Sequence, residues 1–140
     1  FKFTKAILNG DPIDVYNHGD MKRDFTYVTD LVEGIRLLID AAPERLDEVP
    51  EGDSLSPVAP WRVVNIGNSD SVQLTDFIAA IEEATGKTAT CNMMPMQAGD
   101  VPATWADASL LQTLTGYKPQ TNVRDGVQAF VDWYRDYYEV

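Results

Sequence analysis

The stretch HGDMKRDFTYVTDLVEGI, residues 18–35, determines how the sequence around it is interpreted. Lys22 and Arg23 stand side by side in a chain with a formal net charge of −11, which suggests that a negative group docks there. They are followed by DFTYV, residues 24–28, whose aromatic and β-branched side chains predict a strand. A polar turn, a strand and a helix in direct succession indicate a mixed α/β domain.

The second half of this stretch predicts a helix. Thr29 or Asp30 is suited to cap its N-terminus, and Pro43 ends it. Its apolar side chains recur at helical spacing, at Leu31, Ile35, Leu38 and Ile39.

Working outward, the remaining patterns also alternate between strand and helix. Toward the N-terminus, residues 3–8 predict a helix and residues 13–16 a short strand, closed by a polar turn at 17–20. Toward the C-terminus we expect a strand at 62–67, a helix from Leu74 that ends at Gly86, and a strand near 88–94. A short helix capped by Asp107 follows and ends at Gly116, and a last helix runs from Thr121 or Asn122 to about Tyr138. The fold class is therefore α/β or α+β.

Residues 43–60 interrupt this alternation. They carry four prolines and five acidic residues against one arginine, which predicts a solvated loop that is disordered in part or in full. The whole chain, residues 1–140, has the length of one ordinary domain. The sequence lacks an initiator Met and opens within a helical pattern, so we expect it to be a piece of a longer protein.

Composition excludes several classes of function. No run of about 18 apolar residues exists, so a membrane-spanning helix is not expected. The acidity, with 22 acidic against 11 basic residues, argues against nucleic-acid binding. A single cysteine, Cys91, fits a reducing cytosol, and a single histidine, His18, leaves no cluster for a metal site.

Catalytic motifs are missing as well. The sequence has no glycine-rich dinucleotide fingerprint, no phosphate loop and no Tyr-x-x-x-Lys pair. His18 belongs to a polar turn, where a role as a catalytic base is disfavoured, and Cys91 is expected to be a small core residue. The residues therefore predict no catalytic, cofactor-binding or metal-binding side chain in this chain.

Three polar residues are binding candidates, and each has a structural alternative. Arg23 offers a planar guanidinium suited to a diphosphate, or it pairs with Asp20 or Asp24. Asp100, in a Gly-Asp turn, can accept hydrogen bonds from a ribose diol, or it caps its own backbone. Asn65, in the expected strand VVNIG, touches a ligand or ties two loops together, because leaving a buried amide unpaired costs about 1–3 kcal/mol.

A family resemblance rests on segments that occur in a fixed order. They are GDPIDVYNHGDMKRDFTYVTDLVEGI (10–35), VVNIGNSDSVQLTDFI (63–78), MPMQAGDVPATWADAS (94–109) and the closing GYKP turn (116–119) with its helix. Together they resemble the C-terminal portion of extended short-chain dehydrogenase/reductase enzymes, the nucleotide-sugar epimerases and dehydratases. Within this superfamily the sequence resembles the UDP-glucuronate 4-epimerases.

The resemblance implies a role for five residues in binding a UDP-sugar. Arg23 corresponds to the arginine that contacts the diphosphate, and Asp100 to the acid that holds the ribose. Tyr16 ends a strand that faces the uracil, and Asn65 corresponds to a residue near the nucleotide. Gln97 stands where the UDP-galactose branch usually has an arginine, which leaves Arg23 as the chief cation, with Lys22 as a solvated neighbour.

The resemblance also implies a division of labour within a longer enzyme. A preceding part would hold NAD and the catalytic Tyr/Lys pair, while this part would close over the UDP-sugar during 4-epimerisation. A dehydratase or decarboxylase of the same family, and a non-catalytic binding module, remain alternatives. The parent is expected to be a homodimer. The isolated chain is expected to self-associate, because in this family the helix around residues 31–39 packs on the nucleotide-binding domain.

Overall fold

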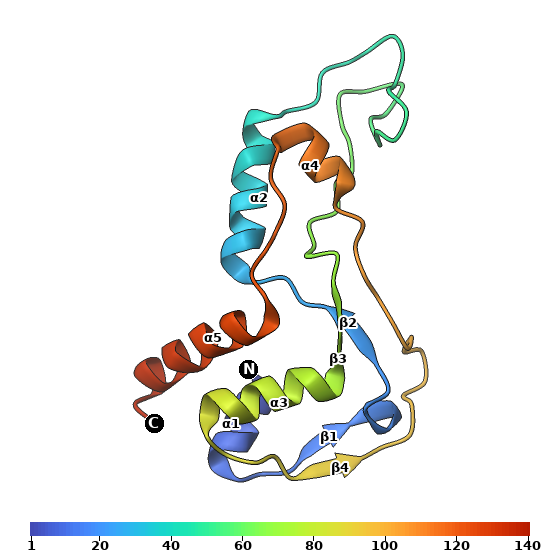
Figure 1. The fold of residues 1–140 in the computed structure, drawn as a ribbon. Helices are drawn as coiled ribbons and strands as arrows, with labels where there is room; N and C mark the ends of the chain where they lie inside the picture. Colours follow the sequence, from blue (N-terminus) through green and yellow to red (C-terminus); the bar gives the residue numbers. More distant parts are fainter. The chain divides into compact units, whose positions relative to one another are not determined.

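The computed structural model describes residues 1–140 and divides them into two compact units (Figure 1). The first unit contains Phe1–Phe25, Ser71–Thr104 and Asn122–Val140, and the second contains Thr26–Asp70 and Trp105–Thr121. Helices and short strands are both present, so the predicted mixed α/β class is confirmed. None of the helices combines the length and the apolar character needed to cross a membrane.

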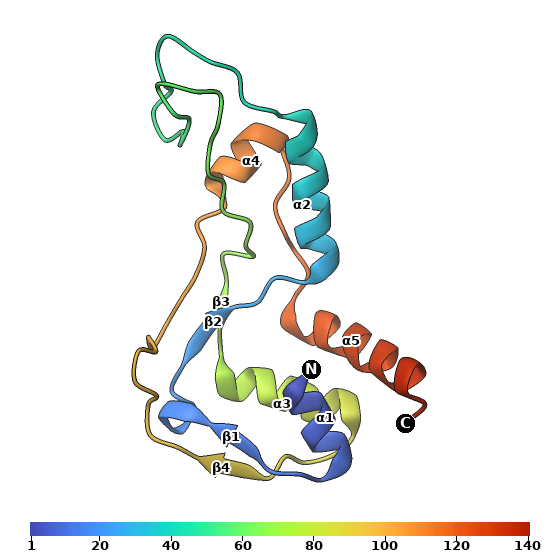
Figure 2. The ribbon, with the colours of Figure 1, turned by 180° about the vertical axis from the view of Figure 1, so that it is seen from behind.

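Three helices build the hydrophobic core of the first unit: α1 (Lys2–Asn9), α3 (Leu74–Thr85) and α5 (Val123–Tyr138). Helix α3 packs against both α1 and α5, and Figures 1 and 2 show α1 beside α3. Apolar side chains at helical spacing face each other because their burial removes them from water. The core contains Ile7, Ile13, Val15, Ile78, Ile81, Val127 and Val131.

The ends of these helices follow the capping signals of the sequence. Gly10 and Gly86 end α1 and α3 with φ angles of 79° and 67°, in the left-handed region that glycine adopts at little cost. At the start of α5, the Asn122 side chain accepts a hydrogen bond of 3.0 Å from the backbone N–H of Asp125. The predicted limits of these three helices are confirmed to within one or two residues.

Four short strands form two pairs in the first unit. Strand β1 (Ile13–Val15) runs parallel to β4 (Cys91–Met93), as Figure 2 shows. In this pairing Asp14 lies opposite Asn92. Strand β2 (Lys22–Asp24) runs antiparallel to β3 (Ser71–Gln73), with Arg23 opposite Val72. Between β1 and β2 lies the turn predicted at 17–20, a short 3₁₀ segment labelled η1 (Tyr16–Gly19).

Two sequence predictions about these strands are wrong. The strand expected at 24–28 lies instead at Lys22–Asp24, because the backbone pairing ends at Asp24 and a helix begins at Val28. Cys91 is exposed, although we expected it in the core. All three residues of β4 are exposed, whereas Ile13 and Val15 of its partner strand β1 are buried in the core.

The second unit is built around α2 (Val28–Asp40) and α4 (Ser109–Thr115), which pack together. Leu111 of α4 is fully buried, and Gly34 of α2 is buried close to it. A Cβ atom at Gly34 would lie 3.7 Å from Leu111 Cδ2 and 3.1 Å from Ile66 Cγ2. The absence of a side chain at Gly34 therefore allows these neighbours to approach the helix closely.

The strand predicted at 62–67 is not a strand. Its side chains alternate as expected, with Val63 and Asn65 exposed and Val64 and Ile66 half-buried, but no other strand pairs with it. Alternation of exposed and half-buried side chains shows that an extended chain has two different faces. A β-strand also needs a neighbouring segment with which its backbone forms hydrogen bonds. Asn65 is consequently exposed rather than buried.

The cap predicted for α2 is also wrong. Tyr27 is its N-cap and makes no side-chain cap bond. Asp30 instead accepts hydrogen bonds from the backbone N–H groups of Gln120 and Thr121, at 3.0 and 2.8 Å. Burial raises the pKa of Asp30, but hydrogen bonds to Thr121, Gln120 and Tyr117 outweigh it, so its pKa lies below the ordinary value of 3.8.

We expect Asp30→Ala to lower the free energy of unfolding of the second unit by about 1 kcal/mol at neutral pH, as loss of a helix cap does. Because the pKa is lower in the folded than in the unfolded state, this stabilisation is present above the unfolded value near 3.8 and is lost as the pH falls through the folded pKa. Denaturant unfolding at about pH 7 and pH 3 checks both statements. Asp47→Ala, at an exposed loop position of the same unit, is the control. An equal loss at both pH values would contradict the role of the charge.

The face of α2 that points away from α4 is apolar and exposed. Val28, Val32, Ile35 and Ile39 are between 49% and 71% exposed and follow one another at helical spacing. We call these four residues the α2 stripe. The predicted apolar pattern thus includes side chains on an exposed face as well as on the packed one.

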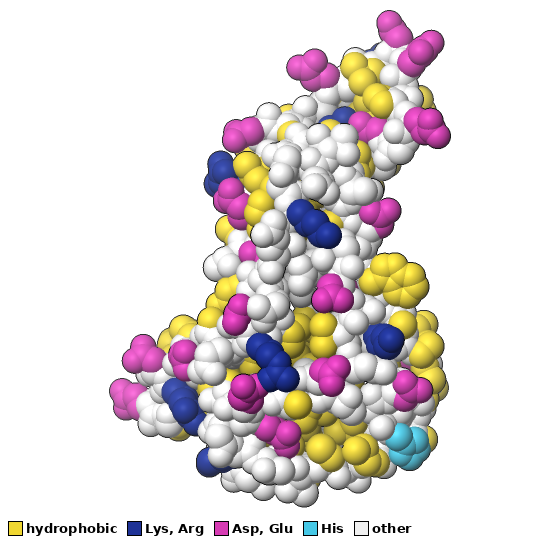
Figure 3. Space-filling model, in the orientation of Figure 1, with side chains coloured by type: hydrophobic (Ala, Val, Ile, Leu, Met, Phe, Trp, Pro, Cys, Tyr) yellow, Lys and Arg dark blue, Asp and Glu magenta, His cyan; other side chains and the backbone are white.

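The acidic loop at 43–60 makes specific contacts in its second half. Asp53 pairs with Arg62 at 2.9 Å, and the Ser56 N–H donates to the Trp61 carbonyl at 2.8 Å. Leu55, which lies between Asp53 and Ser56 in the sequence, is buried. Figure 3 shows acidic side chains gathered on the loop. Its disorder in solution stays a prediction.

Candidate functional site

Strand β2 carries Arg23 and is flanked on both sides. Strand β3 lies on one side, and residues 102–104 run parallel to β2 on the other. The Lys22 N–H donates to the Pro102 carbonyl at 2.8 Å, and the Asp24 N–H donates to the Thr104 carbonyl at 3.1 Å. This pairing places the Gly-Asp turn, which directly precedes residues 102–104, next to Arg23.

Arg23 and Asp100 form an ion pair across this contact. Arg23 Nη2 lies 3.7 Å from Asp100 Oδ1, and Nη1 donates a 2.8 Å hydrogen bond to the carbonyl of Lys22. The two side chains remain 28% and 40% exposed, so a ligand can reach both. The backbone N–H of Asp100 donates to the Gln97 carbonyl at 3.1 Å, which closes the turn and leaves the carboxylate directed at Arg23.

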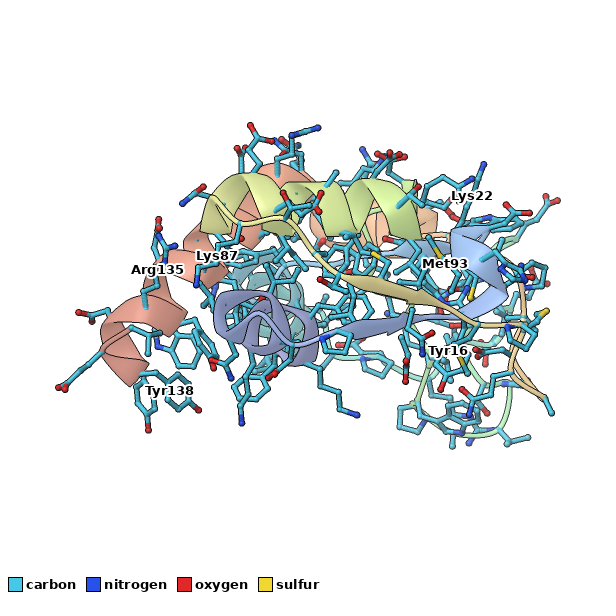
Figure 4. The ribbon with its side chains drawn as sticks, turned by 90° about the horizontal axis from the view of Figure 1, so that it is seen from below. Tyr16, Lys22, Lys87, Met93, Arg135 and Tyr138 are labelled. Atoms are coloured by element: carbon cyan, nitrogen blue, oxygen red, sulfur yellow. The ribbon has the colours of Figure 1, made fainter.

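Tyr16 lies where β1 ends, and it is half-buried. Figure 4 shows Tyr16, Lys22 and Met93 toward one end of the first unit, with Lys87, Arg135 and Tyr138 toward the other. The neighbouring Asp14 is engaged within the sheet, because its carboxylate accepts a 2.8 Å hydrogen bond from Asn92 Nδ2.

The remaining two predicted residues differ in their placement. Gln97 is exposed, and its carbonyl closes the turn that carries Asp100. Asn65 is exposed in the second unit, whereas Tyr16, Arg23, Gln97 and Asp100 all belong to the first. Asp100 thus contacts both Arg23 and Gln97, whereas Asn65 belongs to the other unit.

Sequence reasoning missed two features that build this site. One is the pairing of residues 102–104 with β2, which a segment containing Pro102 gave no reason to expect. The other is the backbone of Asn17 and His18, with φ angles of 49° and 52°. Such left-handed residues cost about 1 kcal/mol or more each unless their surroundings stabilise them. The signal for the second feature was the Asn-His-Gly sequence, because all three types tolerate this region.

Other parts of the structure offer weaker grounds for a site. No group of three or more His, Cys, Asp or Glu side chains is arranged to hold a metal ion. A cavity of about 310 Å³ lies in the second unit, with Leu38, Pro60, Trp61 and Arg62 among its lining residues. The Arg62 guanidinium there is already paired with Asp53.

Comparison with known proteins identifies the family. Residues 2–130 match the family model described as GDP-mannose 4,6 dehydratase. The chain belongs to this family. It is also 50% identical over 141 residues to a probable UDP-glucuronate 4-epimerase of Rhizobium meliloti, in an alignment that covers 99% of this chain and 41% of the relative.

A further relative and a solved structure agree with this. UDP-glucuronate 4-epimerase 2 of Arabidopsis thaliana is 38% identical over 143 residues, covering 99% of this chain and 32% of the relative. The crystal structure of UDP-glucuronic acid 4-epimerase from Bacillus cereus, in complex with UDP-glucuronic acid and NAD, matches with a TM-score of 0.77 and 29% identity. That match covers 97% of this chain and 39% of the Bacillus cereus chain.

The resemblance to extended short-chain dehydrogenase/reductase enzymes is therefore confirmed. The chain spans about two fifths of the length of the Rhizobium relative, since 41% of that protein is covered.

Proposed function

We propose that this chain is the C-terminal, UDP-sugar-binding portion of an NAD-dependent 4-epimerase that interconverts UDP-glucuronate and UDP-galacturonate. The observation that carries the proposal is the ion pair between Arg23 and Asp100, two residues far apart in sequence. The resemblance assigns these residues to the diphosphate and the ribose of one ligand, so they must lie close together. The names of the relatives from Rhizobium meliloti and Arabidopsis thaliana support the same sugar nucleotide.

In this proposal Arg23 binds the diphosphate. Its guanidinium is always charged and has five N–H donors, so it can keep the Lys22 carbonyl and still donate to phosphate oxygens. Asp100 accepts hydrogen bonds from the ribose hydroxyls. Tyr16 contacts the uracil and Gln97 borders the diphosphate, while Asn65 is assigned to the nucleotide by the resemblance alone.

The firm hold on the nucleotide matches the chemistry proposed for the parent. An epimerase must turn the oxidised sugar over between two hydride transfers, so its binding energy belongs on the nucleotide rather than on the sugar. NAD, when bound to the parent, would supply hydride-transfer chemistry at C4 of the sugar. No residue of this chain is assigned to NAD, because the chain has no dinucleotide fingerprint, and we propose that a preceding part of the parent holds the cofactor together with the catalytic Tyr/Lys pair.

A dehydratase or decarboxylase is the second candidate function. The matching family model is described as GDP-mannose 4,6 dehydratase, which supports dehydration as an alternative reaction. Incubating the full-length parent with UDP-glucuronate and separating the products distinguishes the activities. UDP-galacturonate identifies the 4-epimerase, a keto-deoxy sugar the dehydratase, and release of carbon dioxide the decarboxylase. A parent that gives none of these products from UDP-glucuronate would contradict the proposed 4-epimerase. We propose a cytoplasmic location for the parent, in line with the single cysteine.

Calorimetric titration of the parent with UDP, UDP-glucuronate, dUDP and GDP tests the binding site. We expect UDP and UDP-glucuronate to bind. We expect dUDP to bind about 10-fold more weakly, because it lacks the 2′-hydroxyl that donates a hydrogen bond to Asp100. GDP keeps the diphosphate and the ribose and changes only the base, so it reports the contribution of Tyr16. Equal affinity for UDP and dUDP would contradict the role of Asp100, and absence of UDP binding would contradict the proposed site.

We further propose that the parent is a homodimer and that the isolated chain self-associates through the α2 stripe. The α2 stripe is a row of exposed apolar side chains, and burying it in a protein–protein contact removes it from water. Light scattering of the isolated chain is expected to give a mass above that of the 15.6 kDa monomer. Val32→Asp together with Ile35→Asp should restore the monomer, while Val63→Asp, at an exposed valine outside the stripe, should not. A monomeric wild-type chain would contradict this prediction.

A further inference from the structure

Three successive residues between Tyr16 and β2 have left-handed backbone conformations. The φ angles are 49° at Asn17, 52° at His18 and 83° at Gly19. Glycine adopts this region freely, but Asn and His do so at a cost in energy, so two strained residues stand next to each other. Such a run persists only where its surroundings hold it, and it is often found at functional sites.

Contacts on three sides hold this turn. Within the turn, Asn17 Nδ2 donates to the Asp20 carbonyl at 2.6 Å, and the Asp20 N–H donates back to the Asn17 carbonyl at 2.9 Å. The His18 N–H donates to the Met94 carbonyl, just after β4, at 3.0 Å. Gly19 is buried so closely against α3 that a Cβ atom would lie 2.9 Å from Thr75 Cγ2.

The bond from His18 to Met94 lies where the two halves of the candidate site separate. From His18 the chain leads directly to β2 with Arg23, and from Met94 it leads to the turn with Gln97 and Asp100. The two segments meet again at the ion pair of 3.7 Å between Arg23 and Asp100. The conformation at 17–19 therefore fixes one end of the loop that brings these groups together.

We propose that the left-handed turn at 17–19 is a positioning element for nucleotide binding and that Asn17 is its positioning residue. The proposal rests on the proposed UDP site, which it extends to a residue that does not itself touch the ligand. Asn17 combines tolerance of a positive φ with a side-chain donor that closes the turn onto Asp20. The turn holds Tyr16 and Arg23 in place before the ligand arrives, so binding does not have to order them.

The test compares Asn17→Ala with Asn17→Gly in the full-length parent. Alanine disfavours the left-handed region and lacks the donor, so only a fraction of molecules keep the binding geometry, and UDP affinity falls about 10-fold. Glycine also lacks the donor but adopts the left-handed region freely, so affinity stays within about 3-fold of the wild type. Calorimetry gives the UDP dissociation constant, and circular dichroism at the same temperature verifies that each variant is folded.

Two further variants complete the experiment. Glu139→Ala makes the same demand on the backbone, because Glu139 has a φ of 55°, but it lies at the end of α5 and should leave UDP affinity unchanged. If Asn17→Ala does not fold, the double variant Asn17→Gly with His18→Gly permits the turn but makes it flexible, and UDP affinity should fall about 5-fold.

The outcomes separate the two proposals. If Asn17→Ala lowers the melting temperature and leaves the UDP dissociation constant unchanged, the turn has only a structural role and this inference is overturned. The double variant overturns it in the same way if its affinity equals that of the wild type. If the wild-type parent does not bind UDP, the proposed site itself fails, and the inference fails with it.

Discussion

Arg23→Ala in the full-length parent is expected to weaken UDP binding about 100-fold, which corresponds to about 2.7 kcal/mol. The variant removes the charged donor that we propose for the diphosphate, and hydrogen bonds to charged groups contribute about 1.5–3 kcal/mol each. It also leaves the Asp100 carboxylate, now 3.7 Å from the guanidinium, without that partner and close to a negatively charged ligand. Isothermal calorimetry with UDP measures the loss.

The neighbouring cation provides a matched control for this prediction. Lys22→Ala removes the same formal charge from an exposed side chain one position away and should weaken binding by no more than about 3-fold, because exposed charges are screened by solvent. Arg23→Lys keeps the charge but loses the planar fork, and about a 10-fold loss is expected. Equal losses for Lys22→Ala and Arg23→Ala would show that general charge, and not a specific contact, attracts the ligand.

A double-mutant cycle then tests the partnership with Asp100. If part of the Arg23→Ala loss is repulsion of the diphosphate by the unpaired carboxylate, adding Asp100→Asn should recover some of the affinity. The two variants would then be less damaging together than the sum of their separate effects. Strict additivity would mean that the two side chains act independently on the ligand.

Leu111→Ala is expected to lower the free energy of unfolding of the second unit by about 3 kcal/mol, within the range of buried leucine truncations. Leu111 is fully buried and lies in the space that Gly34 leaves open between α2 and α4. The side chains around Leu111 already pack closely against Gly34, so they cannot move far enough to fill the cavity that the variant would leave. Leu46→Ala makes the same chemical change at a side chain that is 42% exposed, and it should change stability by less than about 0.5 kcal/mol.

Hydrogen exchange of individual amides is the appropriate measurement, because the chain has two units and one global transition is not assured. Protection of α2 amides should fall strongly in Leu111→Ala, while amides of α3, in the first unit, serve as an internal reference. Unchanged protection of α2 would contradict the packing described around Gly34.

Helices whose ends are marked by capping residues were predictable from the sequence. Helix α3 has an apolar side at helical spacing and ends at Gly86, and α5 starts at Asn122, whose side chain makes the predicted type of cap. At α4 the N-cap is Ala108, one residue after the predicted Asp107, although Asp107 accepts a 2.9 Å hydrogen bond from the Ser109 N–H. These signals are local, since each residue acts on backbone groups a few positions away.

Features that depend on distant partners were not predictable in the same way. The segment at 62–67 has the side-chain alternation of a strand but no paired neighbour, and Asp30 caps backbone groups near residue 120 instead of its own helix. The candidate site shows the same division. The types of Arg23 and Asp100 suggested their chemistry, whereas their approach depends on a backbone pairing between β2 and residues 102–104 that no local pattern signals.

The parallel pairing of β1 with β4 has a consequence for synthesis on the ribosome. Residues 13–15 leave the exit tunnel long before residues 91–93, and α5 follows later still, so the core of the first unit has no complete set of partners until α5 has been synthesised. A product that stops before α5 would expose the apolar sides of α1 and α3 to chaperones and proteases. Lengthening the acidic loop at 43–60, in contrast, should delay closure only slightly, because the entropy of closing a loop grows with the logarithm of its length.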